Sequence, residues 1–148
     1  MVNSLLLTDF YKTTHVNMYR SDKIASMTSY LTPRSSRLKN LGINKCVNFG
    51  IQGFCMYLKK EFDENFFNRD INEIHEEYID TLKNGLNYTD DMIEETFEKV
   101  KELHDLGFLP ITIKGLPEGI RVPMGVPMIE ISTDPNFPNQ FWVGQAIE

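Results

Sequence analysis

The chain has 148 residues, of which 41% are hydrophobic and 24% charged, a composition typical of a globular domain and unlike that of disordered or collagen-like proteins. Fifteen basic and 21 acidic residues give a formal charge of −6, so the chain lacks the broad positive charge that binds nucleic acid, and we expect no such partner. No run approaches the roughly 20 apolar residues that span a bilayer, so we expect no membrane partner and a cytoplasmic protein.

The first predicted element is a short helix that ends near Met18, with Thr8 or Asp9 as its N-cap because a short polar side chain can accept from the free amides there. The alternating, β-prone run from Lys23 to Leu31 predicts a strand, which Pro33 ends. The following loop gathers cations and hydroxyls without carboxylates, so it is the best candidate for an anion site; these residues are Arg34, Ser35, Ser36, Arg37 and Lys39.

Three helices are predicted in the middle of the chain. An apolar stripe indicates a core-facing helix over residues 49–62. Asp70 with Glu73 resembles a capping box that opens a second helix, for which Gly85 is the natural stop. A third begins near Thr89 and ends at Gly107.

After Gly107, short β-prone runs alternate with glycines and prolines, which predicts a small antiparallel meander, and the final segment FWVGQAIE is predicted to be helical. The buried residues expected in the meander are Ile111, Ile113, Met128, Ile129 and Ile131. The sequence reaches Glu148 without a capping glycine or a polar tail, so we expect residues 1–148 to be one domain that is incomplete at its C-terminus. The predicted fold class is α+β, with helices packed on a small, mainly antiparallel sheet.

No generic catalytic motif is present. Cys46 and Cys55 have no metal-binding spacing, so we expect buried free thiols and no metal site. His75 and His104 fall on packing helices, where a solvent-facing or capping role is expected.

The segment TDFYKTTH, residues 8–15, crowds three useful groups at the start of one helix. Asp9 can accept an amide hydrogen bond, Tyr11 can offer an aromatic face to a planar ring, and Lys12 can meet an anion. The alternative is that Asp9 only caps, Tyr11 packs and Lys12 is solvated. In the same way, Arg34 can grip a phosphate with its forked donors, or belong to a solvated loop.

Five ordered stretches, TDFYKTTH, SYLTPRSSR, VNFGIQG, LPITIKGLPEG and the closing TDP…FW…IE, resemble the first third of nicotinamide phosphoribosyltransferases. The resemblance implies transfer of ribose 5-phosphate from phosphoribosyl pyrophosphate to nicotinamide, giving nicotinamide mononucleotide and pyrophosphate in NAD biosynthesis. It implies Mg²⁺ and ATP as cofactors of the complete enzyme, and a homodimer with active sites across its interface. The position matching Tyr11 stacks on nicotinamide in the neighbouring subunit's site, that matching Asp9 lies beside it, and that matching Arg34 contacts the phosphoribosyl phosphate.

The resemblance also implies that the catalytic residues belong to an irregular α/β barrel further along such an enzyme, so we expect no catalytic residue here and no activity from residues 1–148 alone. His15 lies in the amino-terminal motif and is not the catalytic histidine of the family. Two alternatives remain open at this stage: a nicotinate phosphoribosyltransferase, which begins with a related motif, and a non-catalytic binding or assembly module derived from this fold.

Overall fold

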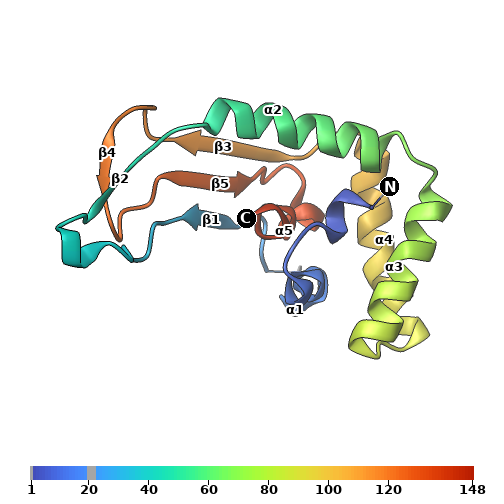
Figure 1. Cartoon of the computed structure of the whole chain (residues 1–148). Coiled ribbons are helices and arrows are strands. Elements are labelled where there is room, and N and C mark those ends of the chain that lie inside the picture. The colour runs from blue at the N-terminus through green and yellow to red at the C-terminus, as the bar shows by residue number, and fades with distance from the viewer. Residues whose placement is uncertain (1, 20–22) are drawn as a thin grey trace.

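The computed structural model describes residues 2–19 and 23–148 and confirms the α+β class. A three-stranded and a two-stranded antiparallel sheet are accompanied by helices, with α3 and α4 standing side by side at one end (Figure 1). The α-helices are α1 (His15–Met18), α2 (Ile51–Phe62), α3 (Ile71–Leu86), α4 (Asp90–Leu106) and α5 (Val143–Ile147). The strands are β1 (Thr28–Leu31), β2 (Lys45–Val47), β3 (Ile111–Gly115), β4 (Arg121–Pro123) and β5 (Ile129–Thr133).

The larger sheet has the order β1-β5-β3 and buries one face. In β5, Ile129, Ile131 and Thr133 are buried and alternate with more exposed residues, the pattern of a strand that is covered on one side. Ile131 lies opposite both Ser29 of β1 and Ile113 of β3, so these residues share the covered face. α5 packs against this sheet.

The predicted strand from Lys23 is shorter than expected, because residues 23–27 are not in a strand. The side chain of Thr133 explains the difference. The Thr133 hydroxyl accepts from the Met27 amide at 2.8 Å, and the backbone carbonyl of Thr133 accepts from the Ser26 hydroxyl at 2.6 Å. One backbone bond remains here, from the Thr133 amide to the Met27 carbonyl at 3.0 Å, but the side-chain bonds replace the second bond of this pair, so regular ladder pairing begins only at Thr28.

The predicted meander after Gly107 is wrong in its pairing. β4 lies between β3 and β5 in the sequence, yet it pairs with β2, which was not predicted, while β3 and β5 pair directly with each other. Gly119 and Gly125 flank β4 and have φ angles of 86° and 85°. These left-handed turns direct β4 away from the larger sheet toward the segment 45–47.

The helix pair α3–α4 follows the prediction closely at its start and end. The Asp70 carboxylate accepts from the Asn72 amide at 2.8 Å, and Gly107 ends α4 with a φ of 72°. Two details were wrong. The capping box with Glu73 does not form, because the carboxylate of Glu73 pairs with Arg69 at 3.3 Å. α3 also continues through Gly85 to Leu86.

The continuation of α3 has two structural causes. Asn87 adopts the left-handed conformation, with a φ of 55°, and serves as the C-cap in place of glycine. Gly85 instead provides space, since a Cβ built on it would lie 2.2 Å from Cζ of Phe10. The helix and the segment that carries Tyr11 therefore approach closely at this point.

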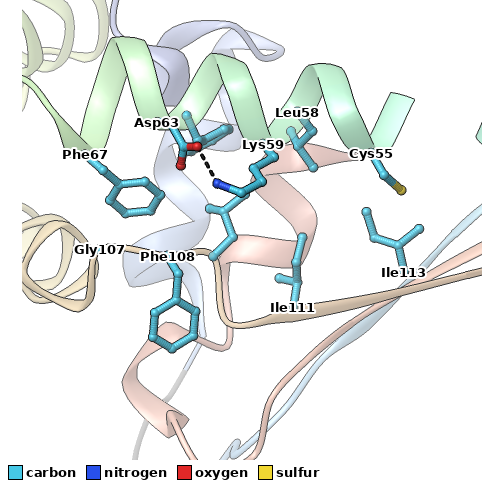
Figure 2. A pocket seen from close by; sticks show the side chains of 11 residues that line it. Cys55, Leu58, Lys59, Asp63, Phe67, Gly107, Phe108, Ile111 and Ile113 are labelled. Atoms are coloured by element: carbon cyan, nitrogen blue, oxygen red, sulfur yellow. Dashed lines mark hydrogen bonds and ion pairs between the residues drawn. The ribbon is translucent and has the colours of Figure 1, made fainter. Parts of the chain in front are cut away.

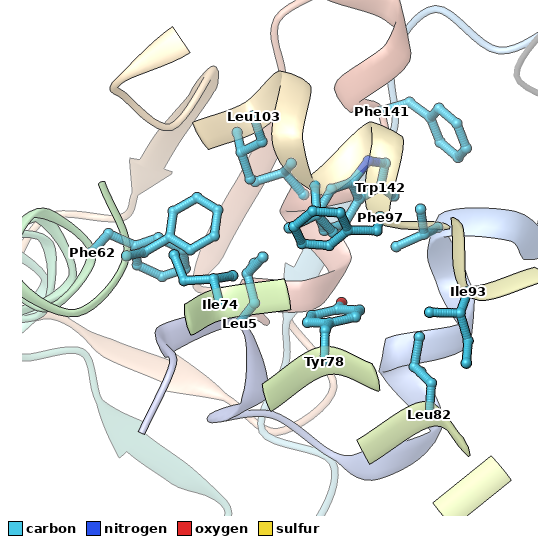
Figure 3. Packing of buried hydrophobic residues seen from close by; sticks show 14 of the residues in the cluster. Leu5, Phe62, Ile74, Tyr78, Leu82, Ile93, Phe97, Leu103, Phe141 and Trp142 are labelled. Carbon is cyan, nitrogen blue, oxygen red and sulfur yellow. The ribbon is translucent and has the colours of Figure 1, made fainter. Parts of the chain in front are cut away.

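The hydrophobic core lies among α2, α3, α4, the N-terminal segment and the C-terminal segment (Figure 3). Tyr78, Phe141 and Trp142 are at most 1% exposed. Burial raises the pKa of the Tyr78 hydroxyl. Because full burial of a large apolar side chain contributes about 1.5–3 kcal/mol, this cluster dominates the stability of the chain.

Candidate functional site

Residues 10–18 form the predicted first helix, but Phe10–Thr14 is a 3₁₀ helix and only His15–Met18 is α-helical. Two threonine hydroxyls explain the tighter turn. Thr13 donates to the Phe10 carbonyl and Thr14 to the Tyr11 carbonyl, both at 2.7 Å, so side chains bind the carbonyls three residues earlier.

Asp9 occupies the N-cap position of this 3₁₀ helix, but its side chain makes no capping hydrogen bond, so the predicted cap is wrong for Asp9. The Asp9 carbonyl accepts from the Lys12 amide at 2.8 Å instead. Asp9 is exposed, and its carboxylate has no hydrogen-bond or ion-pair partner among residues 2–19 and 23–148. The carboxylate is therefore available to a ligand.

Tyr11 does not pack into the core, because 59% of it is exposed. Its ring makes an edge contact with His15, with centroids 5.8 Å apart. His15 in turn contacts Tyr19 at 6.2 Å, and Tyr19 contacts the buried Phe141 at 6.3 Å. Edge contacts thus connect Tyr11 through His15 and Tyr19 to the buried Phe141, while the Tyr11 ring itself stays at the surface.

His15 is the perturbed titratable group of this segment. Burial lowers its pKa, the nearby Lys12 lowers it further, and Glu148 opposes the shift. Its Nδ1 is buried and has no hydrogen-bond partner in the part of the chain that the structure describes. The lowered pKa favours the neutral ring, which supports Tyr11 as an aromatic group.

α4 and α3 hold this segment in place. The ammonium group of Lys99 donates to the Val16 carbonyl and to Oδ1 of Asn17, both at 3.1 Å, and Asn17 also donates to Thr96. Further back, the Asn3 amide donates to the Glu77 carboxylate at 3.2 Å. Sequence reasoning missed Lys99 and gave Gly85 a different role, because both act on residues more than 70 positions away.

Asp9 and Lys12 also line an open hollow that the end of the chain completes. Its other lining residues are Leu6, Leu7, Thr8, Ile147 and Glu148. The structure therefore brings together an acceptor and a cation from the predicted motif. Tyr11 does not line this hollow.

Arg34 lies in the predicted loop, between β1 and β2, and is exposed. The preceding residue is fixed, since the Pro33 carbonyl accepts from the Gly125 amide at 2.7 Å. Figure 1 shows this loop at one end of the sheet and α1 near the other. The chain by itself therefore does not bring Arg34 together with Asp9 and Tyr11.

A different, apolar cavity of about 380 Å³ lies between α2 and the segment from Gly107 to Ile113 (Figure 2). Phe62, Phe67 and Ile111 are among its lining residues, and Lys59 and Asp63 form an ion pair at its rim. Cys55 also lines it and is a free thiol that is half-buried, like Cys46, rather than fully buried as expected. None of the predicted site residues borders this cavity.

The remaining histidines have packing roles, but neither is simply solvent-facing. His75 stacks on Phe97 with centroids 4.1 Å apart, and Nε2 of His104 lies 3.0 Å from the Arg69 carbonyl oxygen. Within the described ranges, no three His, Cys, Asp or Glu residues gather as metal ligands. Within the same ranges, no helix is long and apolar enough to cross a membrane.

Comparison with known proteins identifies a relative of the whole chain. No family model matches the sequence. The chain is 38% identical, over 99% of its length, to a nicotinamide phosphoribosyltransferase of Acinetobacter baylyi. The chain is a homologue of part of a nicotinamide phosphoribosyltransferase. It spans 28% of the length of that relative, so the homology to a nicotinamide phosphoribosyltransferase applies to a portion of such a protein.

Proposed function

We propose that this chain is the amino-terminal, substrate-contacting part of an enzyme that transfers ribose 5-phosphate from phosphoribosyl pyrophosphate to nicotinamide. The observation that carries the proposal is the 38% identity to a nicotinamide phosphoribosyltransferase over 99% of the chain. The exposed Tyr11 and the uncommitted Asp9 support it.

The proposed role of Tyr11 is to stack on the nicotinamide ring. Its ring is 59% exposed and has His15 at its edge, so a flat ligand can lie on its face without displacing another side chain. Asp9, two residues earlier, accepts a hydrogen bond from the ligand's amide. The two residues together suit a neutral aromatic amide.

The proposed role of Arg34 is to bind the phosphate of the phosphoribosyl donor. The side chain is exposed and has no carboxylate partner in the described part of the chain. An arginine without an ion pair keeps all five of its donors for a phosphate. The loop that carries Arg34 lies at one end of the sheet, and α1, which follows the segment of Tyr11, lies near the other (Figure 1). We therefore propose that the two residues serve two different composite sites in a homodimer of the complete enzyme.

Catalysis, in this proposal, requires residues beyond these 148. Mg²⁺ and ATP are proposed as cofactors of the complete enzyme, where the metal would neutralise the charge of the pyrophosphate group. Residues 2–19 and 23–148 present no cluster of metal ligands, so no step is assigned to a metal held by this chain. Its own residues bind and orient the two substrates.

The test uses the purified chain and a chimera in which residues 1–148 replace the matching part of the Acinetobacter baylyi enzyme. We expect no nicotinamide mononucleotide from the chain alone and measurable formation by the chimera. Tyr11→Ala in the chimera should raise the KM for nicotinamide about three- to tenfold, the loss of one aromatic stacking contact. Tyr57→Ala is the matched control, because Tyr57 is 57% exposed and lies on α2.

Each result has a defined meaning. Turnover by the chain alone would contradict the proposed need for further residues. Equal KM values for nicotinamide in the Tyr11 and Tyr57 variants would show that Tyr11 does not contact nicotinamide. A chimera that prefers nicotinate over nicotinamide would favour the nicotinate phosphoribosyltransferase alternative.

A further inference from the structure

One end of the molecule carries a concentration of positive charge that the rest of the chain does not share. We define the basic lobe as residues 32–49 and 116–126, which include β2, β4 and the Arg34 loop (Figure 1). It contains five basic residues and one acidic residue, a formal charge of +4, whereas the whole chain carries −6. The remaining residues therefore carry −10. The basic residues are Arg34, Arg37, Lys39, Lys45 and Arg121.

This charge is not neutralised within the described structure. No ion pair or hydrogen bond joins the side chain of any of these five residues to another described residue. The lobe's one carboxylate is committed elsewhere, since Oε1 of Glu118 accepts from the amides of Gly50 and Gln52 at 3.1 and 3.3 Å. Glu118 thus caps the start of α2, and the five basic side chains remain without counter-charges in the described structure.

Two of the cations line one hollow of about 300 Å³ on the β2–β4 sheet. The register places Val47 opposite Arg121 and Lys45 opposite Pro123, so Lys45 and Arg121 are diagonal neighbours on the same face of the sheet. Asn44 also lines the hollow, while Arg34 does not. Lys45, Arg121 and Asn44 therefore line one hollow from the two strands and the turn before β2.

The backbone adds further donors along the same strand. Asn44 and Asn48 make ladder bonds with Met124 and Ile120, each at 3.0 Å. Since bonding alternates along an antiparallel pair, the amides of Lys45 and Val47 point to the outer edge of β2. No described strand pairs with that edge. The free edge of β2 therefore presents two backbone amides beside the hollow, together with the carbonyl oxygens of the same two residues.

We propose that this hollow binds a phosphate-bearing anion through Lys45 and Arg121. Arginine offers a planar fork and lysine a point charge, the two cations that proteins use for phosphate. The volume of about 300 Å³ suits a small polyanion such as pyrophosphate. The site does not depend on the proposed role of Arg34, which lies outside the hollow.

The test is calorimetric titration of the purified chain with inorganic pyrophosphate at about 50 mM salt, where surface charges are weakly screened. We expect Lys45→Gln and Arg121→Gln each to weaken binding about tenfold, the loss of one charge-assisted contact. Lys101→Gln, an equal charge change at an exposed position of α4, should change binding less than twofold. Circular dichroism checks that each variant folds.

The outcomes separate this site from the proposed function. If pyrophosphate binding were lost in Arg34→Gln but unchanged in the Lys45 and Arg121 variants, the hollow would not be the binding site. The proposed role of Arg34 would be unaffected by that result. If Lys101→Gln weakened pyrophosphate binding as much as the Lys45 and Arg121 variants do, the binding would be a nonspecific attraction of pyrophosphate to surface cations, and the proposed site would be wrong. Absence of pyrophosphate binding by the unmodified chain at millimolar concentration would overturn it as well.

Discussion

The close approach of α3 to the segment that carries Tyr11 predicts an unusual response to a glycine-to-alanine substitution. Gly85 lies inside α3, where alanine normally stabilises a helix by about 1 kcal/mol. At this position a Cβ would lie 2.2 Å from Cζ and 2.9 Å from Cε2 of Phe10. The ring must therefore move, and Phe10 begins the 3₁₀ helix that contains Tyr11.

The two effects have opposite signs and similar size. Overpacking costs about 1–3 kcal/mol, and the ring of Phe10 can relieve part of it because 48% of it is exposed. We expect Gly85→Ala to destabilise the chain by about 1 kcal/mol, after the helix-propensity gain is subtracted. In a Phe10→Ala background the clash is gone, so the same substitution should stabilise by up to about 1 kcal/mol.

Urea denaturation of the four variants of this cycle measures the coupling, with circular dichroism as the signal. Gly53→Ala is the matched control, because Gly53 is also inside a helix and a Cβ built there meets nothing within 4 Å. It should stabilise the chain by about 1 kcal/mol. If Gly85→Ala stabilised the chain as much as Gly53→Ala does, the packing of Phe10 on α3 would be refuted.

Three further substitutions test the core, a helix cap and the histidine. Trp142 is 1% exposed, so Trp142→Ala should lower the free energy of unfolding by about 3–5 kcal/mol, measured by urea denaturation with circular dichroism. A loss smaller than about 1 kcal/mol would contradict its burial. Thr89 caps α4, so Thr89→Ala should cost about 1 kcal/mol in the same assay, whereas an unchanged midpoint would argue against the cap. The pKa of His15 is lowered from 6.5, so the unfolded chain binds a proton before the folded chain does. Stability should therefore fall as the pH drops below about 6.5, and His15→Gln should reduce that slope; an identical pH dependence in both proteins would show that His15 is not shifted.

The helices α3 and α4 were predictable because each combines a long apolar stripe with a polar N-cap, and α4 also ends at a left-handed glycine; these are local signals. Strand β2 was not predictable, since three residues are too few to show alternation. The pairing of β4 with β2 depends on which partner a short strand finds after two glycine turns. That choice is made by contacts between residues about 75 positions apart, and periodicity does not report them.

The candidate site divides in the same way. Residue type made Asp9, Tyr11 and Arg34 candidates and the family resemblance gave them roles, and the structure shows each of them exposed. The sequence did not show that Lys99 and Gly85 fix the Tyr11 segment, because an anchoring lysine and a packing glycine have no motif.

Nor did the sequence reveal that the loop carrying Arg34 and the helix α1, which follows the segment of Tyr11, lie toward different ends of the sheet (Figure 1). In the proposed enzyme, Tyr11 and Arg34 therefore contribute to two different sites. In the proposed enzyme, this separation requires each complete site to combine residues from this chain with residues outside it.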